Sequence, residues 1–192
     1  MNDFAFYFNL GWRHIISKDA LDHQLFIVAL SSVYLVHNWK ELLVLVTAFT
    51  IGHSLTLALS TYGLLEVNTT WVEFFIPVTI LIAAIINFFR KNFHPASYRL
   101  QYVLALLFGL VHGLGFANSI RFMLATDQQI LRPLLGFNLG LEVGQLVVVL
   151  FVLGLSFLIV NKLSLQRKWW VWLLSAAALL WAAWLTIQNL PE

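Results

Sequence analysis

Long apolar stretches alternate with short polar breaks along almost the whole chain. Six stretches approach the ~20 residues that an α-helix needs to cross a bilayer. They cover residues 22–39, 41–62, 71–90, 99–119, 132–160 and 168–189, and the breaks between them carry charged residues, Asn and Pro. The pattern predicts an all-α integral membrane protein. We expect a bundle of about six transmembrane helices that forms one domain over residues 1–192.

The residues before the first stretch have a different character. "MNDFAFYFNLGWRHIISKDALDH" mixes aromatic and apolar side chains with polar ones. It lacks the basic start and small-residue cleavage site of a signal peptide. We interpret it as an N-terminal amphipathic or half-inserted segment at the membrane interface.

Composition agrees with a membrane location. The chain is 60% hydrophobic and 10% charged, whereas soluble domains are nearer ~45–50% and ~25%. It contains no cysteine, which excludes disulfides and thiolate-bound metals. It contains only two methionines, which argues against a soft copper(I) site. The net charge of +2 is small and the basic residues lie in the breaks, so we expect no nucleic-acid partner.

The basic residues also indicate an orientation, because cytoplasmic loops carry an excess of Lys and Arg. The breaks after the first, third and fifth stretches hold seven of them, namely Lys40, Arg90, Lys91, Arg99, Lys162, Arg167 and Lys168. The other side holds four, namely Arg13, Lys18, Arg121 and Arg132. This difference places both termini outside, in the inner membrane of a bacterium.

Ionisable residues occur deep within several stretches. His53 and His112 each lie thirteen residues beyond a basic residue, Lys40 and Arg99, which puts them ~20 Å from the inner boundary at ~1.5 Å per residue. Glu142 lies ten residues inside the outer end of its stretch, ~15 Å from the outer boundary. A charged group at the bilayer centre costs ~2.5–3.5 kcal/mol on an insertion scale, so such groups usually face the bundle interior and pair, bind an ion or relay protons.

Three further ionisable residues stand near the outer ends of their stretches. A continuous span over 22–39 puts Asp22 and His23 near the outer edge, and Glu73 also begins its span there. Together with His53, His112 and Glu142, they predict one polar cavity open to the outer face. We expect His23 to serve as a metal ligand and Asp22 to orient a histidine, although an Asp at a helix start is also an ordinary cap. Glu73, beside Trp71, is also typical of an interfacial anchor.

The fifth stretch has two distinct faces. In "LGFNLGLEVGQL", Asn138, Glu142 and Gln145 share one helical stripe. Glycines spaced by four form a roughly opposite stripe, at positions 136, 140 and 144, and small residues of this kind let helices pack closely. We expect Glu142 to act as a ligand or proton carrier. Its structural alternative is a neutral acid hydrogen-bonded to the neighbouring amides.

Hydroxyl groups surround His53 in "FTIGHSLTL". Thr50 and Ser54 can bond the backbone or orient imidazoles, so we place them with Asn138 and Gln145 around the candidate ligands. The structural alternative for His53, as for His112, is a polar side chain satisfied by hydrogen bonds across helices. His37 and His94 lie at or outside the inner boundary, and we interpret them as interfacial or loop residues.

Four motifs in this order resemble the HupE/UreJ family of membrane proteins, which is associated with hydrogenase and urease maturation. The motifs are "DHQLF" at 22–26, "FTIGHSLTL" at 49–57, "GLVHGLGFA" at 109–117 and "GFNLGLEVGQ" at 136–145, and the resemblance covers essentially the whole chain. It implies a nickel or cobalt permease whose metal ligands include His14, Asp22, His23, His53, His112 and Glu142. The first histidine departs from the family pattern. His14 precedes His23 by nine residues, where the pattern has seven.

Imidazole and carboxylate ligands suit nickel, cobalt, zinc or ferrous iron. We favour a permease for a divalent transition metal, nickel or cobalt, over an enzyme. Two alternatives stay open. One is an intramembrane zinc hydrolase, in which the metal activates water. The other is a non-catalytic membrane component or sensor. A chain of this size leaves little room for two large moving halves, which favours either a homo-oligomer or a slow, channel-like permease.

Overall fold

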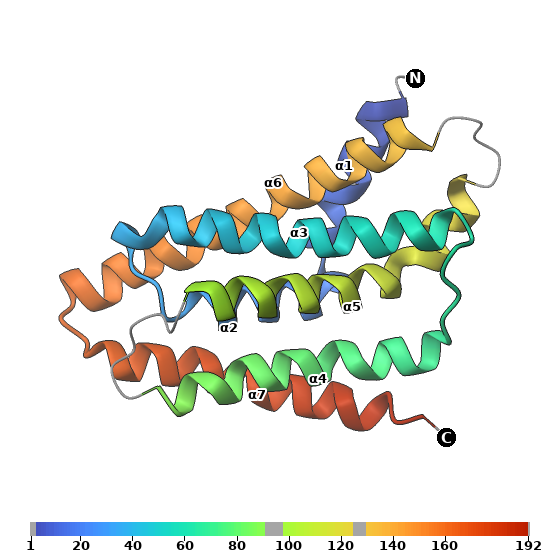
Figure 1. The fold of residues 1–192 in the computed structure, drawn as a ribbon. Helices are drawn as coiled ribbons and strands as arrows, with labels where there is room; N and C mark the ends of the chain where they lie inside the picture. The colour runs from blue at the N-terminus through green and yellow to red at the C-terminus, as the bar shows by residue number, and fades with distance from the viewer. Residues whose placement is uncertain (1–2, 91–97, 125–129, 192) are drawn as a thin grey trace.

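The computed structural model describes residues 3–90, 98–124 and 130–191, which fold almost entirely as helices (Figure 1). Within these residues there are seven α-helices and no strand. The helices are α1 (Asp3–Ile16), α2 (Leu21–Ser31), α3 (Trp39–Thr61), α4 (Thr69–Phe88), α5 (Tyr98–Leu124), α6 (Leu131–Ser156) and α7 (Arg167–Gln188). Two short 3-10 turns, η1 (Lys18–Ala20) and η2 (Val36–Asn38), lie between helices, and a π-helical segment, η3 (Phe157–Lys162), continues α6. The prediction of an all-α bundle is confirmed.

Four helical segments are long and apolar enough to cross a membrane. They are Val36–Thr61, Thr69–Phe88, Leu131–Lys162 and Arg167–Gln188. The large apolar side chains that α6 and α7 turn outward include Leu150, Phe151, Leu173, Leu180 and Ile187, each 65–70% exposed. So much exposed apolar surface on these helices requires lipid around them. The protein is therefore a membrane protein.

The N-terminal part of the chain is a helix broken near the middle of the bundle. α1 ends at Ile16 and α2 begins at Leu21, with the polar residues of η1 between them. Figure 1 shows α1 reaching the centre of the bundle from one end, and α2 continuing from there toward the other end. α2 stops at Ser31, and Ser32 and Tyr34 are fully buried where the chain turns toward α3.

Side chains satisfy the backbone groups that the break leaves open. Helix C-termini carry carbonyls without intrahelical partners, and no water is available to them in hydrocarbon. The side-chain Nε2 of Gln24 donates to the carbonyls of Ile15 at 2.8 Å and Ser17 at 3.0 Å. At the other end of α2, Asn87 of α4 donates to the carbonyl of Ala29 at 2.8 Å. The break is thus built into the fold by specific hydrogen bonds.

Glycines bring two helix pairs into close contact. α1 lies along the glycine stripe of α6, where a Cβ added to Gly140 would overlap the carbonyl oxygen of Phe8. In the other pair, a Cβ on Gly113 of α5 would overlap the carbonyl oxygen of His53 on α3. Only glycine permits such backbone contact. These contacts fix α1 and α3 at the heights where their histidines lie.

The remaining helices close the bundle on the side away from α1 and α6. α4 and α7 pack along each other and cover α2. Asn87 also donates to the hydroxyls of Ser32 and Ser175, so one buried amide joins α4, α7 and the turn after α2. The N- and C-terminal ends of the described chain lie toward the same end of the bundle (Figure 1).

Candidate metal centre

Four histidines from four helices meet in the interior of the bundle. They are His14 at the end of α1, His23 at the start of α2, His53 in α3 and His112 in α5. The ring centroids of His14 and His23 lie 4.7 Å apart, and those of His23 and His112 lie 4.9 Å apart. His23 is 3% exposed, and His53 and His112 are not exposed at all.

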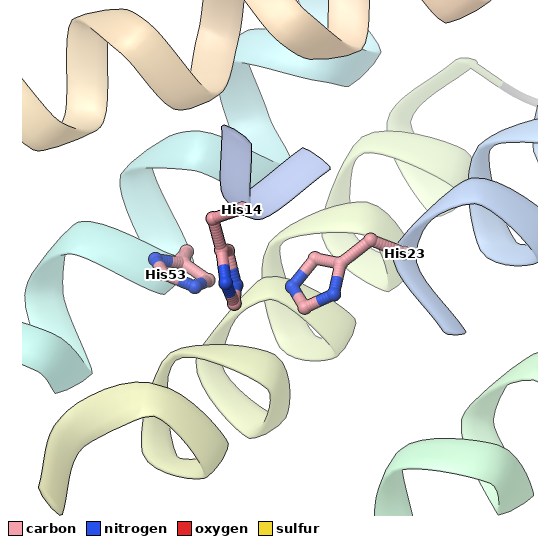
Figure 2. A group of neighbouring side chains, drawn as sticks. All are labelled: His14, His23 and His53. Atoms are coloured by element: carbon pink, nitrogen blue, oxygen red, sulfur yellow. The ribbon is translucent and has the colours of Figure 1, made fainter. Parts of the chain in front are cut away.

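Three of these side chains converge closely enough to share an ion. Figure 2 shows His14, His23 and His53 extending toward one another from α1, α2 and α3. One ring nitrogen from each lies within 4.8 Å of the others. The ring of His112 completes the group from the side of His23. Small movements would bring these nitrogens onto one cation at ordinary ligand distances of ~2.0–2.1 Å.

The helix break explains how His14 joins the group. His14 lies in the last turn of α1 and His23 in the first turn of α2. A continuous helix would separate two residues nine apart by ~13 Å along its axis. The turn at η1 changes the direction of the chain and brings the two rings together. His23 therefore lies beside His53 in the bundle interior, and not near the outer edge where a continuous 22–39 span would put it.

Hydrogen bonds at one nitrogen orient two of the rings. Nδ1 of His23 lies 3.0 Å from Oδ1 of Asp22, which also accepts the backbone N–H of His23 at 2.7 Å. Nδ1 of His112 lies 2.8 Å from the carbonyl oxygen of Phe108. Both partners are acceptors, so each Nδ1 carries the proton and each Nε2 presents a lone pair. Metal-binding histidines are commonly held in this way.

Five other ring nitrogens of the cluster have no partner among the described residues. Nε2 of all four rings is buried without a hydrogen bond, and so is Nδ1 of His53. A buried polar atom left without a partner costs about 1–3 kcal/mol, and a native structure rarely gathers several in one place. A ligand that accepts electron pairs would satisfy one nitrogen of each ring together.

Phenylalanines enclose the cluster. The rings of His14 and Phe116 have centroids 4.2 Å apart, and Phe137 stacks on Phe116 at 5.0 Å and on His53 at 6.2 Å. The ring centroids of Phe26 and Phe49 lie 5.5 and 5.2 Å from that of His112. A shell of this kind keeps water and bulk dielectric away from a metal site. Sequence reasoning missed this shell, because apolar residues in an apolar span carry no distinguishing signal.

Glu142 lies in a separate polar contact between α3 and α6. Its Oε1 accepts from the hydroxyl of Thr47 at 2.7 Å, and Oε1 of Gln145 accepts from Thr50 at 2.9 Å. Both threonines precede His53 on α3. The structure therefore places Glu142 and Gln145 in the contact between α3 and α6, and Glu142 is not among the three side chains whose ligand atoms gather within 4.8 Å.

The other residues expected around the ligands bond mainly to backbone. Ser54 donates to the carbonyl of Thr50 at 2.6 Å, and Nδ2 of Asn138 donates to the carbonyl of Leu134 at 2.9 Å. Oδ1 of Asn138 is buried without a partner among the described residues. His37 is exposed. His94 lies outside the described residues.

One comparison with known proteins gives a match. A family model described as HupE / UreJ protein matches residues 1–189, essentially the whole chain. No curated protein and no solved structure matches the chain.

Proposed function

The chain belongs to the HupE/UreJ family, and we propose that it is a membrane permease for a divalent transition metal, nickel or cobalt. His14, His23, His53 and His112 hold the ion during its passage. Asp22 orients His23, and Thr50, Ser54, Asn138 and Gln145 shape the surroundings. The protein lies in a bacterial inner membrane with both termini outside.

One observation carries this proposal. Four imidazoles from four helices, three of them buried and that of His14 half-buried, present buried Nε2 atoms that have no hydrogen-bond partner among the described residues. A structural network of histidines would pair these nitrogens with hydroxyls or amides. Their convergence is typical of ligands, and the bonds that hold Nδ1 of His23 and of His112 are those that support a ligand.

The donor set restricts the metal. Imidazole nitrogen suits nickel, copper, zinc and iron, whereas magnesium and calcium prefer oxygen. The chain has no thiolate to offer, so its binding is weaker and more easily reversed than that of a structural cysteine site. Reversible binding is what a permease needs. Nickel or cobalt therefore fits the site, with zinc as a competitor.

One observation also supports a second function, that of an intramembrane zinc hydrolase: three candidate ligands lie close together. Three histidines with one open position form a known type of catalytic zinc site, and His14, His23 and His53 supply three ring nitrogens within 4.8 Å of one another. In such an enzyme the metal would remain bound through purification and the open position would hold water. Stoichiometric zinc in freshly purified protein, with no uptake of any metal, would support this function over transport.

Uptake by proteoliposomes tests the permease. Purified protein is reconstituted with a metal-sensitive dye inside the vesicles, and nickel or cobalt is added outside. We expect uptake by the wild-type protein and by His37→Ala, which removes an exposed histidine. His53→Ala should abolish uptake, since His53 is fully buried in the cluster. Equal uptake by the two variants would contradict the proposal.

A further inference from the structure

A cavity of about 320 Å³ opens beside the helix break, between α2, α4 and α7. Its lining includes Lys18, Asp22, Glu73, Trp181, Trp184 and Asn189. Glu73 and Asn189 stand at the end of the bundle that carries both termini, where Nδ2 of Asn189 donates to the backbone carbonyl of Glu73 at 3.2 Å. We call this cavity the vestibule.

One side chain that lines the vestibule also contacts a histidine of the cluster. Asp22 lines the vestibule, and its Oδ1 is bonded to Nδ1 of His23. The side chain of Asp22 is 26% exposed and that of His23 only 4%. The carboxylate therefore stands at the boundary between the open cavity and the enclosed, phenylalanine-lined site.

The charges of the vestibule suit a cation. Asp22 and Glu73 contribute two carboxylates, against the single ammonium of Lys18. A concave surface with an excess of one charge raises the local concentration of the opposite ion. Glu73 is exposed, whereas the side chain of Asp22 is 26% exposed and bonded to His23.

Two other cavities among the described residues do not offer such a path. One of about 410 Å³ is lined almost wholly by apolar side chains such as Val147, Phe151 and Leu174, as a groove against lipid would be. Its amide side chain, that of Gln24, is already bonded to the end of α1. Another, beside Asn87 and Arg90, has a volume of only about 30 Å³.

We propose that the vestibule is the access route by which a hydrated divalent cation reaches the histidine site. Glu73 is the first carboxylate that the ion meets, and Asp22 is the residue at which it exchanges water for imidazole. This inference rests on the proposed permease function and adds to it the path and the two carboxylates along it.

The absence of cysteine in the chain makes the path accessible to labelling. Leu185→Cys places a thiol in the vestibule, and Leu174→Cys places one in the apolar groove as the matched control. Both variants are reconstituted and treated with a charged, membrane-impermeant methanethiosulfonate. We expect modification of Leu185→Cys to reduce nickel uptake at least about tenfold, and added nickel to slow the modification. The control should keep its uptake.

A second variant keeps the proposal testable if Leu185→Cys folds poorly. Glu73→Gln should raise the nickel concentration for half-maximal uptake by about three- to tenfold at low salt. The increase should be smaller at high salt, because dissolved ions screen the attraction between an exposed carboxylate and the cation. The dissociation constant of the histidine site, measured in detergent, should not change. An unchanged half-maximal concentration would overturn the role of Glu73.

The results distinguish this inference from the function on which it rests. Wild-type protein that takes up nickel, with modified Leu185→Cys taking it up equally well, would overturn the vestibule alone. Wild-type protein that neither binds nor takes up a transition metal would overturn both.

Discussion

Nδ1 of His23 lies 3.0 Å from Oδ1 of Asp22, and this contact determines which nitrogen of the imidazole faces the other histidines. The carboxylate accepts the Nδ1 proton, so Nε2 keeps its lone pair in the buried cluster. A carboxylate partner also makes an imidazole a more basic ligand. The pair joins the surface of the vestibule to the interior of the metal centre.

Asp22→Asn tests this relationship. The amide oxygen can still accept from Nδ1, but the negative charge is lost. We expect the dissociation constant for nickel to rise by about 10- to 100-fold, the usual cost of removing such a partner, while the protein remains folded. Titration calorimetry in detergent measures the change. Glu73→Gln is the matched control, because it removes a carboxylate of the same cavity that does not contact a histidine, and equal affinities in the two variants would contradict the assignment.

Gly113→Ala tests the close approach of α5 to α3. The new methyl group would overlap the backbone of His53, and overpacking of this kind costs about 1–3 kcal/mol. We expect a lower melting temperature in detergent and weaker metal binding. Gly154→Ala is the control, since its added Cβ would meet no neighbouring helix within 4 Å. Replacing that helical glycine should stabilise the protein by about 0.5–1 kcal/mol. Equal melting temperatures would refute the packing argument.

Gln24→Ala tests the hydrogen bonds at the helix break. It leaves the carbonyls of Ile15 and Ser17 without their side-chain donor, at a cost of about 1–3 kcal/mol. Because His14 lies one residue before Ile15, we also expect weaker nickel binding. Thermal unfolding and metal titration measure the two effects. Gln188→Ala, at the exposed end of α7, should change neither, and full nickel affinity in Gln24→Ala would show that the break does not position His14.

Glu142→Gln tests whether Glu142 is a metal ligand or only part of the polar contact between α3 and α6. Glu142 accepts a hydrogen bond from Thr47, and a glutamine can accept the same bond. We expect the nickel dissociation constant to change by less than about threefold, below ~0.7 kcal/mol, whereas His53→Ala should abolish tight binding. The same calorimetric titration compares the two variants. If Glu142→Gln weakened nickel binding as much as His53→Ala does, Glu142 would have to be a ligand.

The helical bundle was predictable from sequence because lipid imposes a simple pattern. Apolar runs of sufficient length, separated by charged breaks, predict membrane helices, and α3, α4, α6 and α7 follow the predicted stretches within a few residues. The glycine stripe of α6 was also visible, since its spacing of four marks one helix face. Its partner was not, because a segment with mixed polarity such as 3–16 does not reveal which helix it contacts.

The candidate site was predictable only in part. His53 and His112 could be matched in depth because each lies on one continuous helix that begins near a basic residue. His23 could not, since its height depends on the break after Ile16 and on the turn after Ser31. Such a break requires tertiary partners, including Gln24 and Asn87, that no local pattern identifies. The family resemblance implicated His14, and its nine-residue spacing from His23 is explained by that break.

The most direct test is the coordination of nickel in the purified protein. Elemental analysis and X-ray absorption spectroscopy of nickel-loaded protein measure how much metal each chain holds and which atoms surround it. We predict a single nickel ion per chain with a nitrogen shell and the multiple scattering typical of imidazole rings. The imidazole signal should weaken in His53→Ala and persist in His37→Ala. A shell made only of oxygen, or imidazole scattering unaffected by His53→Ala, would contradict a metal centre built from these four histidines.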